Sequence, residues 1–142
     1  MKVLVTGSSG YVASDLIPRL SNKAKVSGID LSPSEYTDIH VSIADRKLNS
    51  HLSNISDEGL YIVNLAAARF DFGATAKDYF RLNVECHAKF LESLEVYWVK
   101  KFIHISSVAS LDGRDIPYSE ALECDDAYRS TKYLQEELIQ NW

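Results

Sequence analysis

The stretch Val5–Ala13, VTGSSGYVA, joins an apolar run to a helical pattern and indicates how the chain folds. Residues 2–6, KVLVT, are mostly apolar and β-branched, which predicts a buried strand. From residue 10 to residue 20 apolar residues recur at helical spacing, which predicts a helix. Gly7 allows a tight turn between them, and Ala13 is small enough for the helix to pack closely on a sheet. The stretch therefore predicts the opening of a βαβ unit.

The rest of the chain repeats this alternation of strands and helices. Further strands are expected at 25–30, 38–43, 60–67 and 101–107, and helices at 46–54, 75–96 and 126–142, with an irregular stretch at 108–125. Short apolar strands that alternate with helices are typical of parallel sheets covered on both faces. We therefore predict an α/β fold, a Rossmann-type doubly wound parallel sheet of about five strands, formed by residues 1–142 as one domain.

Composition excludes several classes of function. The net charge of −5 disfavours nucleic acid and anionic membranes as partners, because both reward concentrated positive charge. The two cysteines are too few for a disulfide framework, and the four histidines are scattered, so no metal site is expected. No apolar run approaches the roughly 20 residues of a membrane span, and no targeting segment precedes the first strand. A cytoplasmic protein is the resulting expectation.

The glycine turn is also a candidate anion site, because Gly10 opens a helix whose first N–H groups can bind a pyrophosphate. Asp30 ends the second predicted strand, where a carboxylate can accept the hydroxyls of an adenosine ribose and would repel a 2′-phosphate. No Arg or Lys lies in the turn or directly after Asp30 to neutralise such a phosphate. NAD is therefore favoured over NADP as the cofactor. The alternative is that Asp30 only caps the next turn.

A second pair of residues indicates proton transfer. Tyr128 and Lys132, in YRSTK, are four apart and share one helix face. A phenol needs a pKa shift worth about 4 kcal/mol to work at pH 7, and one ammonium at about 6 Å supplies roughly 2.8 kcal/mol of it. Ser106 and Ser107 close the fifth predicted strand, at the sheet edge where such folds bind ligands. A serine there can orient a substrate carbonyl or alcohol, or merely cap exposed backbone.

Together these motifs resemble the short-chain dehydrogenase/reductase superfamily, in its extended branch of NAD-dependent epimerases and dehydratases. The resemblance is carried by TGSSGYVA (6–13), NLAAA (64–68), LNVECHAKFLES (82–93), FIHISSVASLDG (102–113) and YRSTK (128–132). These stretches are similar to the family's TGxxGxxG/A turn, HLAA strand end, NVxGTxxLLEA helix, serine-bearing strand and YxxSK motif. Cys86 and His87 stand where that helix usually has Gly and Thr, which we interpret as a packing change.

The resemblance assigns roles to individual residues. It implies that Ser107 rather than Ser106 orients the substrate, that Tyr128 is the acid/base, and that Lys132 lowers the pKa of this tyrosine. The cofactor-binding residues that we predict are Gly7, Ser9, Gly10, Tyr11, Val12, Asp30, Leu31, Ala66, Ala67, Asn83 and Lys132.

The same resemblance predicts the activity. It implies an NAD-dependent oxidoreductase, epimerase or dehydratase acting on a nucleotide sugar or a similar hydroxyl or carbonyl substrate. We expect a homodimer formed through helices 75–96 and 126–142. Relatives continue beyond the last helix, so these residues are expected to lack the C-terminal substrate region and to be inactive alone. The alternatives are a truncated or regulatory dinucleotide-binding module without turnover, and a purely structural domain.

Overall fold

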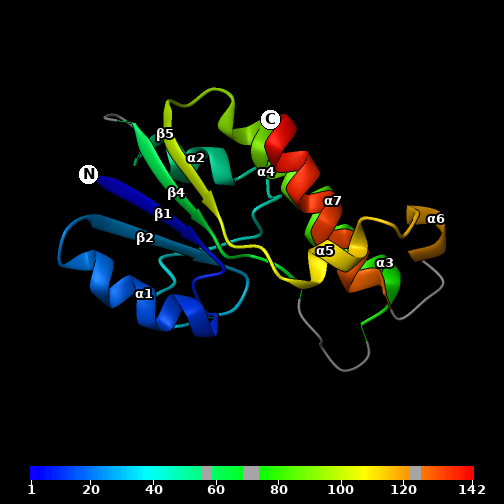
Figure 1. Cartoon of the computed structure of the whole chain (residues 1–142). Helices are drawn as coiled ribbons and strands as arrows, with labels where there is room; N and C mark the ends of the chain where they lie inside the picture. The colour runs from blue at the N-terminus through cyan, green and yellow to red at the C-terminus, as the bar shows by residue number, and fades with distance from the viewer. Residues whose placement is uncertain (56–58, 69–73, 122–125) are drawn as a thin grey trace. The chain divides into compact units, whose positions relative to one another are not determined.

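The computed structural model describes residues 1–55, 59–68, 74–121 and 126–142, and it divides into two compact units (Figure 1). Unit 1 comprises Met1–Ala66 and Glu92–Ile105. Unit 2 comprises Ala67–Leu91 and Ser106–Trp142.

Unit 1 contains a five-stranded parallel sheet in the order β3-β2-β1-β4-β5. Its strands are β1 (Lys2–Thr6), β2 (Lys25–Asp30), β3 (Ile39–His40), β4 (Leu60–Asn64) and β5 (Val99–His104). The order reverses at β1, whose neighbours β2 and β4 lie on opposite sides. In open sheets of this kind, ligands bind beyond the carboxyl ends of the strands next to such a reversal. The predicted Rossmann-type sheet is confirmed.

Three strands differ from the predicted ranges. The third is reduced to Ile39–His40. Just before it, the carboxylate of Asp38 accepts the N–H of Gly28 at 2.9 Å in place of a backbone carbonyl. The fourth ends at Asn64. The next two amides donate to the Thr6 hydroxyl, and the amide of Leu65 also donates to the Thr6 carbonyl. The fifth runs from Val99 to His104, and its register against β4 shifts near Leu60.

Helices α1 (Tyr11–Ser21) and α2 (Leu48–Ser53) belong to unit 1. Ala13 and Ile17 of α1 are buried in one hydrophobic cluster with residues of β1 and β4. Ala13 has no exposed surface, which agrees with the expectation that a small residue is needed there. Pro18 lies in the last turns of α1 and is exposed.

Unit 2 is built from helical segments. They are α3 (Ala76–Phe80), the π-helical turn η1 (Arg81–Glu85), α4 (Cys86–Leu94, continuing into unit 1), α5 (Ala109–Gly113), α6 (Tyr118–Ala121) and α7 (Ala127–Asn141). The long helix predicted at 75–96 is therefore interrupted by a π turn. Thr75 caps its start through a reciprocal hydrogen-bonded box with Asp78.

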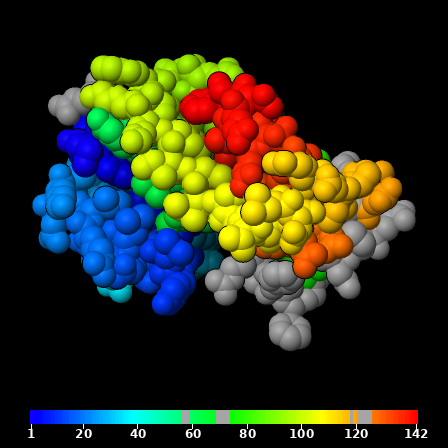
Figure 2. Space-filling view, in the orientation of Figure 1, coloured from blue at the N-terminus to red at the C-terminus, as the bar shows by residue number. Residues whose placement is uncertain are grey.

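The stretch predicted as irregular at 108–125 contains two short helices, and residues 122–125 lie outside the described residues. The first of them, α5, packs tightly on α7. A Cβ added to Gly113 would lie 2.1 Å from the carbonyl oxygen of Arg129, so only glycine allows this approach. Figure 2 shows the surfaces of α5 and α7, in yellow and orange-red, directly against each other.

Candidate functional site

The glycine turn of unit 1 has the geometry that its sequence predicts. Gly7 has a φ of 70°, and a Cβ on it would lie 2.8 Å from the amide nitrogen of Ala66. Both facts require glycine, because a side chain would be strained and would clash with backbone. The N–H of Gly10 donates to the carbonyl of Gly7 at 3.0 Å and closes the turn. The structure thus brings Gly7, Gly10 and Ala66 together.

The turn leads into the open N-terminus of α1. Gly10 is the N-cap residue and supplies no side-chain cap, and the N–H of Ser14 donates to its carbonyl at 3.1 Å. The amides of Tyr11 and Val12 precede that bond, where a helix leaves N–H groups without intrahelical partners. Both side chains are exposed. This end of the helix therefore offers donors and a positive dipole to an anion.

Asp30 lies directly beside the turn. Its Oδ2 accepts the N–H of Ser9 at 3.1 Å, and its Oδ1 accepts the N–H of Ser32 at 2.9 Å. These bonds hold the half-buried carboxylate at the end of β2, and each oxygen keeps a lone pair for a further donor. Leu31, the next residue, is exposed. A carboxylate held here can accept two ribose hydroxyls, so the residues present fit the adenosine and pyrophosphate part of a dinucleotide.

A polar network that the sequence analysis missed joins the ends of three strands. Thr6, Asn64 and His104 are in register as the last residues of β1, β4 and β5. Thr6 Oγ1 donates to Asn64 Oδ1 at 2.5 Å, and Asn64 Nδ2 lies 3.1 Å from His104 Nδ1. Thr6 Oγ1 also accepts the N–H of Ala66 at 3.1 Å. The network holds the backbone of Ala66 in place. The sequence feature that could have predicted it is a polar residue at the end of each of these three apolar strands.

In unit 2, Tyr128 and Lys132 lie on α7 as predicted. The half-buried ring of Tyr128 packs edge-on against Tyr79, with 6.0 Å between ring centroids. Lys132 is only 1% exposed. Burial lowers the pKa of its ammonium from 10.5 to about 8, and the negative charge of Glu136 partly opposes this shift. Lys132 therefore remains mainly charged at pH 7, in a site that weakens its hold on the proton.

The partners of Lys132 come from residues that the sequence analysis did not connect with it. Its Nζ donates to Oε1 of Gln135, one turn further along α7. Nε2 of Gln135 lies 2.8 Å from Nε2 of His87, and Nδ1 of His87 lies 3.0 Å from the carbonyl oxygen of Leu82. His87, which we interpreted as a packing change, is buried and its ring makes these two polar contacts.

The two candidate serines have different partners. Ser106 Oγ donates to Glu136, which also accepts the hydroxyl of Ser110 at 2.8 Å. Ser107 Oγ accepts the N–H of Ala109 at 3.2 Å, so its own O–H can still donate to a ligand. Of the two hydroxyls, that of Ser107 is the better suited to bind a substrate oxygen.

Asn83 lies in the π turn and is completely buried. Its Oδ1 accepts the N–H of Ala68 at 2.7 Å, and its Nδ2 donates to Thr131 Oγ1 at 3.2 Å. The side chain predicted to contact cofactor therefore ties the segment after Ala67 to α7. Ala67 itself is exposed.

The described residues contain no cluster of three or more His, Cys, Asp or Glu residues that could hold a metal ion. Within the same ranges, no helix has the length and apolar character needed to cross a membrane.

The fold and the glycine turn define a Rossmann-type protein with a dinucleotide half-site. Residues 3–142 match the model of the NAD dependent epimerase/dehydratase family, and the chain belongs to this family. The predicted membership is confirmed, and NAD is the cofactor of the family. No curated protein matches the sequence.

Solved structures agree with this assignment. A short-chain dehydrogenase/reductase superfamily protein from Agrobacterium tumefaciens with bound NAD is 25% identical, with a TM-score of 0.78 over 99% of this chain and 44% of its own. UDP-glucuronic acid 4-epimerase from Bacillus cereus, in complex with NAD, is 24% identical, with a TM-score of 0.76. The match covers 99% of this chain and 51% of the epimerase chain. The yeast methylglyoxal/isovaleraldehyde reductase, complexed with NADPH, is 15% identical, with a TM-score of 0.78. The match covers 99% of this chain and 52% of the reductase chain. The chain thus spans about half the length of these structures.

Proposed function

We propose that this chain is the NAD-binding part of an extended short-chain dehydrogenase/reductase that oxidises, epimerises or dehydrates its substrate. The observation that carries the proposal is the position of Asp30. Its carboxylate is held beside the glycine turn by the amide of Ser9, where the ribose of an NAD bound at the N-terminus of α1 would lie. A Ser107–Tyr128–Lys132 site is the proposed source of the chemistry.

The charge around Asp30 favours NAD over NADP. The donors that hold its carboxylate are the amides of Ser9 and Ser32, and neither residue brings a positive charge. A 2′-phosphate would place its negative charge against the carboxylate, with no Arg or Lys in the turn to offset the repulsion. The NADPH-bound yeast reductase shares the fold at low identity, so it does not bear on this preference.

The residues of unit 2 are suited to move a proton. The Tyr128 phenolate would take the proton of a substrate alcohol and so become the phenol, and the phenol would return a proton to a substrate carbonyl oxygen. The Lys132 ammonium would stabilise the phenolate. Ser107 would donate its O–H to the same substrate oxygen and so orient it. Bound NAD would supply the hydride acceptor at its nicotinamide ring. Lys132 must be charged to act, so its lowered pKa sets an upper pH limit near 8 for this role.

Nucleotide sugars are the proposed substrates, in line with the UDP-glucuronic acid 4-epimerase among the similar structures. We also propose a cytoplasmic homodimer built on the helices of residues 75–96 and 126–142. A second candidate function is a dinucleotide-binding module without turnover. This candidate shares the proposed NAD site and differs only in having no turnover.

Calorimetric titration of the chain with NAD and with NADP tests the proposal. We expect NAD to bind more tightly, and Asp30→Ala to weaken NAD binding about 10- to 100-fold, because hydrogen bonds to a charged group are worth about 1.5–3 kcal/mol. Asp15→Ala is the matched control, since this exposed carboxylate of α1 pairs only with Arg19 among the described residues. Unchanged affinity in Asp30→Ala, or tighter binding of NADP to the parent chain, would refute the assignment. Turnover of a nucleotide sugar would exclude the module without activity.

A further inference from the structure

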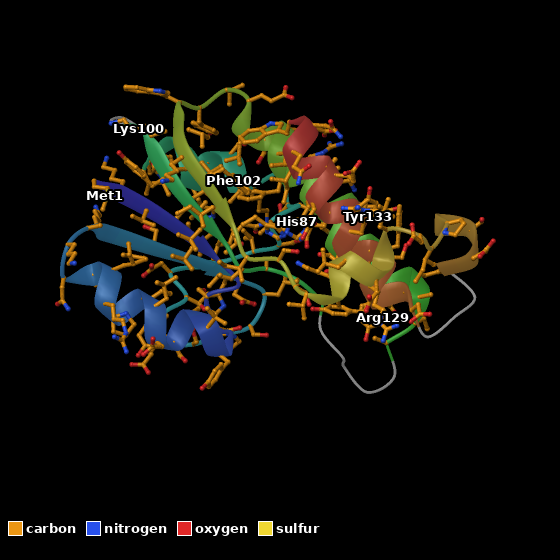
Figure 3. The ribbon with its side chains drawn as sticks, viewed as in Figure 1. Met1, His87, Lys100, Phe102, Arg129 and Tyr133 are labelled. Carbon is orange, nitrogen blue, oxygen red and sulfur yellow. The ribbon has the colours of Figure 1, made fainter. Side chains whose placement is uncertain are left out.

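A continuous line of buried polar groups begins at Lys132 and ends at a backbone carbonyl. Lys132, Gln135 and His87 are each no more than 1% exposed. They connect Lys132 Nζ to Gln135 Oε1, Gln135 Nε2 to His87 Nε2, and His87 Nδ1 to the carbonyl of Leu82. Figure 3 shows His87 beside α7, the helix that carries the other two side chains.

Only one arrangement of protons satisfies all three contacts. The carbonyl of Leu82 can only accept, so Nδ1 of His87 carries a proton and donates. The Lys132 ammonium can only donate, so the Gln135 oxygen faces it and the Gln135 NH₂ group faces His87. Nε2 of His87 must then accept, which requires a neutral ring with its single proton on Nδ1. The hydrogen bonds therefore all run toward Leu82, starting from the charge on Lys132.

The π turn supplies the end of this line. Leu82 lies within η1, where hydrogen bonds span five residues instead of four, and His87 is the fifth residue after it. The ring of His87 therefore folds back onto a carbonyl of the turn that precedes its own helix. π turns are rare, and they occur often at functional sites.

We propose that Gln135 and His87 are positioning residues for Lys132. The anchored His87 ring holds the Gln135 amide in one orientation, and the amide oxygen then holds the Lys132 ammonium in place. This inference rests on the proposed function, which gives Lys132 its role beside Tyr128. His87 and Gln135 touch neither substrate nor cofactor in this role and act only through Lys132.

Glu136 and His87 are titratable groups that enter this arrangement. Glu136, on the same helix, attracts the ammonium electrostatically, while its carboxylate accepts hydrogen bonds from Ser106 and Ser110. His87 is the other. A proton added to its Nε2 would remove the acceptor for Gln135 and place a second positive charge near Lys132. The arrangement therefore requires a His87 that stays neutral throughout the working pH range.

The tautomer of His87 can be read directly in the parent chain. Long-range ¹H–¹⁵N correlation spectra distinguish a neutral ring protonated at Nδ1 from one protonated at Nε2 and from the charged ring. We expect the Nδ1-protonated neutral form at pH 7. A ring protonated at Nε2, or charged at pH 7, would overturn the proposal, because neither could accept from Gln135.

Variants test the link to Lys132. Its pKa is measured from the ¹³Cε shift of labelled lysine, assigned by the signal lost in Lys132→Met. We expect Gln135→Leu to lower this pKa by about one to two units, because the charged amine loses a hydrogen bond of the charge-assisted kind. Gln140→Leu, at an exposed position of the same helix, is the control and should leave it unchanged. An unchanged pKa in folded Gln135→Leu would refute the proposal.

His87 variants separate positioning from packing. His87→Leu fills the space without an acceptor and should lower the pKa of Lys132 by about half a unit or more. His87→Gln places an amide oxygen where Nε2 lies and should restore the parent value. Equal values in the two variants would show that the ring only fills space. NAD titration of Asp30→Ala tests the proposed function separately, because that carboxylate belongs to unit 1 and these pKa values are measured without cofactor.

Discussion

Replacing Lys132 by Met should stabilise the fold at neutral pH while it removes the amine that we propose to act beside Tyr128. Met is close to lysine in length and carries no charge. The side chain of Lys132 is 1% exposed, and burial lowers the pKa of its ammonium from 10.5 to about 8. A charged amine that binds its proton less tightly in the folded chain than in the unfolded chain opposes folding.

The magnitude follows from the shift. A difference of roughly 2.5 pKa units corresponds to about 3 kcal/mol of stability lost while the amine is charged in both states. Met recovers this amount but leaves the oxygen of Gln135 without its donor, which costs about 1–2 kcal/mol. The expected net gain in free energy of unfolding at pH 7 is therefore about 1–2 kcal/mol.

The sign of the pH dependence distinguishes this cause from better packing. Below pH 8 the amine is charged in both states, and its full cost is present. Between pH 8 and 10.5 the unfolded chain binds more protons than the folded chain, so the stability of the parent rises with pH. Above 10.5 the cost is gone. The advantage of Lys132→Met should therefore shrink between pH 8 and 10.5 and then reverse.

Urea unfolding, monitored by circular dichroism at pH 7, 8.5 and 10, measures this gain in stability. It appears as a higher urea concentration at the midpoint of unfolding with an unchanged m-value. Lys89→Met is the control, since Lys89 lies exposed on α4 and should change stability by no more than about 0.5 kcal/mol. The reasoning is refuted if Lys132→Met is less stable than the parent at pH 7, or if its advantage is the same at all three pH values.

Three further changes test other parts of the structure. Tyr128→Phe should lower kcat by about 10²–10⁴-fold on any substrate that the protein turns over and leave NAD affinity within about twofold; retained activity would point to another acid/base. Gly7→Ala should lower the free energy of unfolding by at least about 1–3 kcal/mol, because φ is 70° and the new Cβ would meet Ala66 N at 2.8 Å; an unchanged urea midpoint would contradict this. Thr75→Ala should cost about 1 kcal/mol by removing the cap of α3, and Thr75→Ser should retain most of that stability; equal losses in both would argue against the cap.

The sequence alone was enough to predict the features that depend on residues close to one another in the chain. The strands alternate with helices at readable spacing, and the glycine turn has the conformation that Gly7 permits. Asp30 is beside that turn because parallel strands bring their carboxyl ends to one sheet edge. These features follow from local sterics and a two- or 3.6-residue period, which short windows of sequence contain.

The tertiary structure decided the features that join distant residues. The hydrogen bond between His87 and Gln135 joins residues 48 apart in the chain, and no periodic pattern in the sequence predicts it. The π turn at Asn83 interrupts a helix that reads as continuous in the sequence, and the buried amide of Asn83 bonds to Ala68 and Thr131. The pKa of Lys132 likewise depends on the side chains that exclude water from it. Burial and hydrogen-bond partners are properties of the packed chain, so the environment of Lys132 could be known only from the folded structure.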